Sequence, residues 1–188
     1  FSGPQNIAFN STGTYAYVTN YNDNTVLLCY VNGSTGALGS CSTTGSGFST
    51  PYNITLNPAG TYAYVANYTP DTVSVCSVNS STGALGPCST SGSGFNGPTG
   101  ITFNYDATYV YVVNNANNNV SVCSVNGSTG ALGPCSTSGS GFSNPTDIAV
   151  NSTGTYAYVG NLNANNVSVC SVNGSTGALG SCSTTGSG

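Results

Sequence analysis

The sequence "TYAYVTN" at residues 14–20 recurs three times, each time 47 residues further along the chain. The later copies are "TYAYVAN" at 61–67, "TYVYVVN" at 108–114 and "TYAYVGN" at 155–161. Self-comparison extends the repeat over the whole chain, with repeats that begin at Phe1, Phe48, Phe95 and Phe142. We therefore expect four blades, at residues 1–47, 48–94, 95–141 and 142–188, that together make one propeller unit.

Each repeat alternates short apolar runs with turn signals, which indicates β-strands. In the first repeat we expect strands at about 5–10, 14–19, 25–31 and 37–43. Helices are disfavoured because Gly, Asn, Ser and Thr dominate and no window shows a helical period. Four antiparallel strands in a unit of this length are typical of a propeller blade. The expected fold is all-β, with four blades of four antiparallel strands, as a closed four-bladed ring or a segment of a longer array.

Two motifs resemble a known family. The pattern "P-x-x-I-x-x-N-x-x-G-T-Y-A-Y-V-x-N" followed by "V-S-V" resembles the blade repeat of the YVTN family of β-propellers. The segment "V-N-G-S-T-G-A-L-G" resembles the blade ending of lactonase-like propellers. The resemblance covers all four repeats, whereas propellers of this kind usually have about seven blades. A lactonase-like propeller implies a polar catalytic site at the central channel, built from charged and imidazole side chains.

The chain carries almost no charge. It has no Lys, Arg or His, and its acids are Asp23, Asp71, Asp106 and Asp147. Without cations it cannot neutralise phosphates, so we expect no nucleic-acid partner. No apolar run is long enough for a membrane span. The residues of a lactonase site do not carry over and acid–base catalysis needs a titratable group near neutrality, so we expect no catalytic residue, no cofactor and no enzyme.

Eight cysteines form four pairs with the same spacing: Cys29 and Cys41, Cys76 and Cys88, Cys123 and Cys135, Cys170 and Cys182. If the last two strands of a repeat form a hairpin around residues 34–36, Cys29 lies opposite Cys41 and Val31 opposite Gly39. Opposed residues of this kind are close enough for a disulfide bond. Free buried thiols and a metal site are the alternatives, although zinc prefers short cysteine spacings with His. Disulfide bonds predict an extracellular or cell-surface location.

Ten asparagines lie in Asn-x-Ser/Thr sequences: Asn10, Asn32, Asn53, Asn67, Asn79, Asn119, Asn126, Asn151, Asn166 and Asn173. A chain so rich in Asn, Ser and Thr would contain nearly as many such sequences by chance. Only the turn site recurs in every repeat, as Asn32, Asn79, Asn126 and Asn173. These four have two interpretations, as formers of a tight hairpin turn and as acceptors of attached glycans.

The leading functional hypothesis is a secreted, disulfide-linked structural protein, such as a fibre or surface-layer subunit, with attached glycans as an option. No capping repeat is visible and the chain lacks an initiator Met, so we expect a processed product or a piece that meets copies of itself or further repeats. The alternative is an adhesion propeller that binds carbohydrate or protein, with the loop at 114–119 as its one candidate patch. We expect the alternating Tyr15 and Tyr17, and their equivalents, to pack inside the blades.

Overall fold

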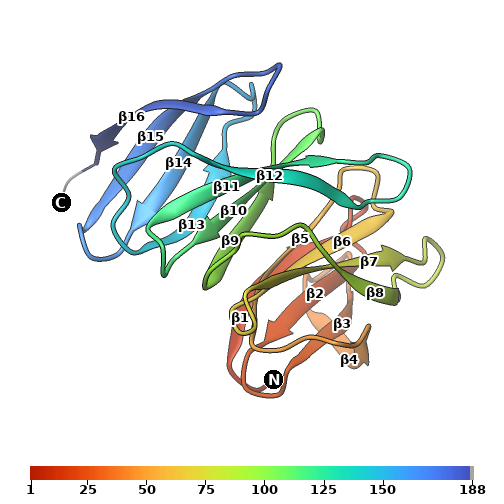
Figure 1. Ribbon diagram of the computed structural model, residues 1–188. Coiled ribbons are helices and arrows are strands. Elements are labelled where there is room, and N and C mark those ends of the chain that lie inside the picture. The colour runs from red at the N-terminus through yellow and green to blue at the C-terminus, as the bar shows by residue number, and fades with distance from the viewer. Residues whose placement is uncertain (187–188) are drawn as a thin grey trace. The chain divides into compact units, whose positions relative to one another are not determined.

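A computed structural model describes residues 1–186, which form sixteen β-strands and no helix. The strands make four antiparallel sheets of four strands, one sheet for each repeat (Figure 1). Within each sheet the strands lie in the order in which they follow one another in the sequence. The expected all-β fold with four propeller-type blades is therefore confirmed. No helix within the described residues could cross a membrane.

The sheets follow the repeats. The first contains β1 (Pro4–Phe9), β2 (Tyr15–Asn20), β3 (Thr25–Val31) and β4 (Leu38–Thr44). The second contains β5 (Pro51–Leu56), β6 (Tyr62–Asn67), β7 (Thr72–Val78) and β8 (Leu85–Ser91). The third contains β9 (Pro98–Phe103), β10 (Tyr109–Asn114), β11 (Asn119–Val125) and β12 (Leu132–Ser138). The fourth contains β13 (Pro145–Val150), β14 (Tyr156–Asn161), β15 (Asn166–Val172) and β16 (Leu179–Thr185).

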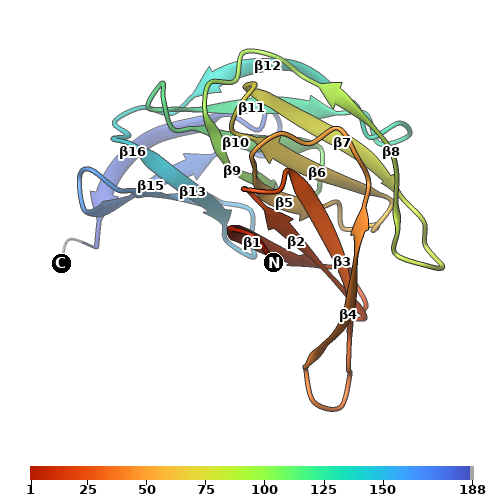
Figure 2. The same cartoon turned by 90° about the horizontal axis from the view of Figure 1, so that it is seen from below.

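The chain divides into two compact units, Phe1–Ser91 and Gly92–Gly188. The first unit contains the sheets β1–β4 and β5–β8, and the second contains β9–β12 and β13–β16 (Figure 2). In each unit the first strands of its two sheets contact one another, β1 with β5 and β9 with β13. The boundaries of the individual blades, and their assembly into one propeller unit, stay predictions.

A buried tyrosine joins the two sheets of each unit. In the first unit Tyr17 packs against Phe48 and Leu85, and its hydroxyl donates a 2.7 Å hydrogen bond to the Gly83 carbonyl oxygen. In the second unit the hydroxyl of Tyr111 donates a bond of the same length to Gly177. Burial raises the pKa of Tyr17 and of Tyr111 to about 12, so both hydroxyls stay protonated donors near neutrality. The expected core role is thus confirmed for these tyrosines, whereas their equivalent in the last sheet, Tyr158, is exposed.

The asparagine that ends the "TYAYVxN" motif joins the neighbouring strand to the connection that leads into the sheet. Asn67 is 1% exposed. Its Nδ2 donates to Ser74 Oγ (2.9 Å), and its Oδ1 accepts the backbone N–H of Ser49 (3.2 Å). Because a buried amide is costly unless it is hydrogen-bonded, this position requires Asn rather than an apolar residue. The bond to Ser49 also fixes the connection that leads into β5.

Each sheet carries one disulfide bond between its last two strands, with sulfur pairs Cys29–Cys41, Cys76–Cys88, Cys123–Cys135 and Cys170–Cys182. The paired Cα atoms lie 4.1 Å apart in every case. No free cysteine remains in the described part of the chain, so the thiol and metal alternatives are not adopted.

The expected register beyond the cysteines is wrong by one residue. Cys29 lies opposite Cys41 as expected, but Val31 pairs with Leu38 instead of Gly39. An irregularity in the ladder between Cys29 and Val31 accounts for the shift, because a bulge places two residues opposite one. The shift places Leu38 and its equivalents on the same face of their sheets. In the second sheet this leucine is Leu85, which is buried in the core of the first unit.

Candidate functional site

The first strands of the four sheets share a repeat position that holds Asn6, Asn53, Gly100 and Asp147. In the second unit Gly100 and Asp147 lie directly against each other. A Cβ atom added to Gly100 would come within 2.9 Å of both the Cα and the Oδ1 of Asp147. The ladder of β13 is irregular between Pro145 and Asp147, as it is at the start of the first strand in the other three sheets. The residue that lies against Asp147 is therefore a glycine, which has no side chain.

The environment of Asp147 changes the pKa of its carboxyl. Desolvation raises the pKa of its carboxyl, and a 2.9 Å hydrogen bond from the Ile148 backbone N–H to Oδ1 opposes the rise only in part. Asp147 is nevertheless an exposed residue of β13, so its side chain keeps solvent access. A carboxylate with a raised pKa that water can reach is suited to accept a proton from that water.

In the first unit this repeat position holds two asparagines, whose side chains carry no charge. The Asn6 backbone N–H donates to Thr19 Oγ1 at 3.0 Å, and Asn6 Oδ1 accepts the backbone N–H of Ile54 at 3.3 Å. Asn6 therefore ties β1 to β5, and Asn53 is buried in β5. Neither amide can exchange a proton near neutrality, so acid–base chemistry at this repeat position belongs to Asp147 alone.

Three half-buried tyrosines gather beside β5 in the first unit. The rings of Tyr21 and Tyr52 lie 6.2 Å apart and perpendicular, and those of Tyr52 and Tyr68 lie 6.0 Å apart. The residues equivalent to Tyr52 in the second unit are Thr99 and Thr146, so the cluster is specific to the first unit. Sequence reasoning missed it, although the departure of Tyr52 from the repeat was a visible signal.

The remaining acids are separate from this position. Asp23 and Asp71 lie in the turns after β2 and β6, and Asp106 lies in the turn between β9 and β10. A hydrogen bond from the Thr108 hydroxyl, with a further bond from Asn104, lowers the pKa of Asp106. Within residues 1–186 no group of three or more His, Cys, Asp or Glu side chains is placed to hold a metal ion.

The asparagine-rich run at 114–119 is part of the fold. Asn115 Nδ2 donates to the Pro145 carbonyl oxygen at 2.9 Å, and Asn118 Oδ1 accepts the Asn144 backbone N–H at 2.6 Å. The run therefore holds the turn after β10 to the start of β13. Those two amides are engaged within the second unit, which weakens the run as a ligand-binding patch.

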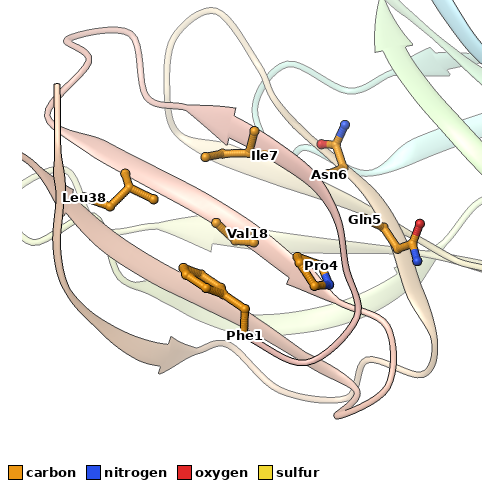
Figure 3. A pocket seen from close by; sticks show the side chains of 7 residues that line it. All are labelled: Phe1, Pro4, Gln5, Asn6, Ile7, Val18 and Leu38. Atoms are coloured by element: carbon orange, nitrogen blue, oxygen red, sulfur yellow. The ribbon is translucent and has the colours of Figure 1, made fainter.

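The outer face of the first sheet is apolar and open, with a pocket of about 400 Å³ (Figure 3). The pocket is lined by Phe1, Pro4, Gln5, Asn6, Ile7, Val18 and Leu38. Ile7 is 45% exposed, whereas its repeat equivalent Ile54 is 2% exposed because the first sheet covers it. The face of β1–β4 therefore exposes an isoleucine at a repeat position that a neighbouring sheet covers in the second repeat.

Comparison with known families identifies the class of protein. Residues 1–141 match the family described as "Lactonase, 7-bladed beta-propeller". The chain belongs to this family, which confirms the lactonase-like resemblance of the repeats. No curated protein matches the chain.

Solved structures give the same fold at low sequence identity. A candidate 6-phosphogluconolactonase from Bacteroides uniformis superposes with a TM-score of 0.78 at 21% identity, over 97% of this chain and 53% of that one. A similar candidate from Bacteroides fragilis gives 0.75 at 17% identity, over 97% and 58%. The periplasmic gluconolactonase of Pseudomonas aeruginosa gives 0.76 at 18% identity, over 94% and 55%. The chain thus spans about half the length of the structures it matches.

These matches correct two expectations from the sequence. The hypothesis of a structural scaffold, fibre or surface-layer subunit is wrong, because the family and the neighbours indicate a lactonase-type propeller. The expectation that the chain is not an enzyme is contradicted by the same findings. Both expectations rested on the absence of His, Lys, Arg and Glu side chains that could form a catalytic site. The family match rests instead on the residues that build the blades.

Proposed function

We propose that this chain is part of a lactonase-type hydrolase that opens the ring of a sugar lactone. The match of residues 1–141 to the lactonase family carries the proposal. The fold similarity to proteins named as lactonases supports it. The activity is proposed for the protein to which these four blades belong.

In the proposed reaction Asp147 is the general base. Its carboxylate takes a proton from a water molecule, whose oxygen adds to the lactone carbonyl carbon. The bond between that carbon and the ring oxygen then breaks, and the ring oxygen receives the proton from Asp147. The products are a carboxylic acid and a hydroxyl on one open chain. The raised pKa of Asp147 supports this role, because a stronger base accepts the proton more readily.

The proposed substrate is an uncharged lactone. A phosphorylated sugar would require cations to bind its phosphate, and this chain has no Lys, Arg or His. The tyrosines around Tyr52 lie in the first unit, whereas Asp147 lies in the second, so no part in this site is assigned to them.

The test is the rate of glucono-δ-lactone hydrolysis, measured as acid release at constant pH against the spontaneous reaction. We expect the native protein to exceed the spontaneous rate and Asp147→Asn to lose about a hundredfold or more in kcat. Activity should fall as the pH is lowered through the raised pKa of Asp147, because the protonated carboxyl cannot act as a base. Asp23→Asn, in an exposed turn, is the matched control and should retain full activity.

Two results would contradict parts of this proposal separately. No turnover by folded protein on any neutral sugar lactone would remove the function. Full activity in Asp147→Asn would leave the function and remove the role of Asp147.

The disulfide bonds in all four sheets indicate a non-cytoplasmic compartment. We propose a periplasmic or extracellular location. The neighbour named as a periplasmic gluconolactonase supports the periplasmic alternative. Fractionation of the source cells, with the protein detected by antibody, tests this. Recovery with the cytoplasmic fraction in reduced form would contradict it.

A further inference from the structure

The turn between the last two strands of each sheet holds an asparagine in a fixed conformation. In the first sheet Asn32 Oδ1 accepts the backbone N–H groups of Ser34 (2.9 Å) and Thr35 (3.1 Å). The turns at Asn79, Asn126 and Asn173 repeat both bonds at 2.9–3.1 Å. All four asparagines are exposed, and the β3–β4 turn projects away from its sheet (Figure 2).

The side-chain nitrogen of these four asparagines is available. Their hydrogen bonds all run through Oδ1, and no bond within residues 1–186 uses their Nδ2. The third residue of each sequence is a serine, at positions 34, 81, 128 and 175. Each turn therefore presents an Asn-x-Ser acceptor sequence with its oxygen fixed and its nitrogen pointing to solvent.

The other six Asn-x-Ser/Thr sites are less accessible, because each asparagine is buried or half-buried. Asn53 and Asn67 are buried. The Nδ2 atoms of Asn10 and Asn151 donate to threonine hydroxyls two to four residues later. Asn119 and Asn166 are half-buried at the first residues of β11 and β15, where Oδ1 accepts an amide of the preceding strand. A sugar attached to Asn53 or Asn67 would have to enter the core.

There is room for a sugar beside the turn in the first unit. Asn79 lines a pocket of about 450 Å³ together with Ser80, Ser81, Tyr15 and Tyr30. Tyr30 is 54% exposed and meets Tyr15 edge-to-face, with ring centres 6.4 Å apart. A sugar attached to Asn79 could lay its apolar face on these rings while its hydroxyls bind the serines.

We propose that Asn32, Asn79, Asn126 and Asn173 are N-glycosylation sites, one at the tip of each blade. The co-reactant is an oligosaccharide linked to a polyprenyl diphosphate, transferred by an oligosaccharyltransferase of the export pathway. Asn Nδ2 bonds to C1 of the first sugar and loses one proton. The bond from C1 to the diphosphate oxygen breaks, and the polyprenyl diphosphate leaves with the electron pair. The disulfide bonds place the chain on an export route where such transfer occurs.

The test expresses the whole chain through a secretory pathway that carries this transferase, and maps sugars on its peptides by mass spectrometry. We expect glycan on the four turn asparagines in most molecules and none on Asn53 or Asn67. Four unmodified turn sites in folded, disulfide-bonded protein would overturn the proposal. Occupancy of Asn53 or Asn67 equal to that of the turns would overturn it as well, because burial would then not discriminate.

Single substitutions in one turn sharpen the test. Ser81→Ala removes the acceptor sequence of Asn79 but keeps the backbone N–H that binds Asn79 Oδ1, so the protein should fold and lose one glycan. Ser80→Ala changes the neighbouring residue and keeps the acceptor sequence, so all four glycans should remain. Loss of the Asn79 glycan in both variants, or in neither, would contradict the assignment of this site.

Discussion

At the scale of single residues, the setting of Asp147 links its proposed catalytic role to stability. Partial desolvation in the folded protein raises the pKa of the Asp147 carboxyl, and unfolding returns it to its ordinary value. A raised folded pKa means that the folded state binds the proton more tightly than the unfolded state. The free energy of unfolding therefore falls as the pH rises from the ordinary pKa through the raised one. Near neutrality the ionised carboxylate destabilises the fold that holds it.

Asp147→Asn should therefore raise the melting temperature near neutral pH while it lowers activity. The asparagine keeps an Oδ1 acceptor for the Ile148 N–H and cannot ionise. Below the ordinary carboxyl pKa of about 4 the two proteins should melt alike, because Asp147 is then protonated in both states. Thermal unfolding at acidic and neutral pH measures the difference. A lower melting temperature of the variant at neutral pH would be inconsistent with this account.

Gly100→Ala tests the contact between Gly100 and Asp147. The new methyl group would meet the Cα of Asp147, which is backbone and cannot rotate away, so we expect a loss of about 1–3 kcal/mol in the free energy of unfolding. Urea unfolding measures it. Gly33→Ala is the control, because nothing lies within 4 Å of the added atom there. Equal stability of the two variants would show that the contact is loose.

At the scale of the element, the hairpin of each sheet is closed covalently. The cysteines are 12 residues apart, so the bond closes a short loop in the outermost pair of strands. The outer strand β4 is exposed over most of its length and has few apolar contacts of its own. The bond between Cys29 and Cys41 thus adds a covalent link to the backbone ladder that holds β4 on the sheet edge.

Replacement of Cys29 and Cys41 together by Ser should lower the free energy of unfolding by about 3 kcal/mol, mainly through greater freedom of the unfolded chain. Denaturant unfolding of the double variant measures the loss. The equivalent change at Cys170 and Cys182 should cost a similar amount. A loss below about 0.5 kcal/mol in both would mean that the strands hold the hairpin unaided.

The sequence predicts the strands well and the site poorly, for different physical reasons. The motif "TYAYVTN" and the cysteine spacing depend on local geometry, so strands and disulfide pairs follow from them. The register beyond Cys29 was missed because a bulge leaves no mark in the alternation of residues. The contact between Asp147 and Gly100 was missed because the two residues are 47 positions apart in the sequence.

At the scale of the whole molecule, each unit joins its two sheets in the same way. Tyr17 in the first unit and Tyr111 in the second lie between two sheets and donate to a turn carbonyl. The hydrophobic clusters around them contain the first phenylalanine, the β-strand isoleucine and the β-strand leucine of the next repeat. One packing solution therefore serves both units.

This repetition predicts alkaline sensitivity in both units. The pKa of Tyr17 and Tyr111 is about 12 in the folded protein, against about 10 in an unfolded chain. Their contribution to stability is complete below about pH 10 and is lost as the pH rises towards about 12. Circular dichroism during alkaline titration should show unfolding in that window. Tyr17→Phe should weaken the pH dependence of the first unit; an unchanged titration would contradict the prediction.

Self-association stays a prediction, and the open face of the first sheet provides its test. Ile7 and Leu38 are exposed there, although their equivalents Ile54 and Leu85 are buried by a neighbouring sheet. We expect the mass of this chain in sedimentation experiments to rise with concentration, and Ile7→Asp to suppress the rise. Thr12→Asp, in an exposed turn, is the control and should behave as the native chain. A constant monomer mass would contradict the prediction.

The closed hairpins also determine how the protein responds to proteolytic nicking. The turn at 32–37 is exposed and lies inside the loop that Cys29 and Cys41 close. A protease that cuts this turn breaks the chain but leaves both fragments joined through sulfur. Nicked protein should migrate as one species on a non-reducing gel and separate only after reduction. Every sheet can therefore accept one such cut and keep its outer strand.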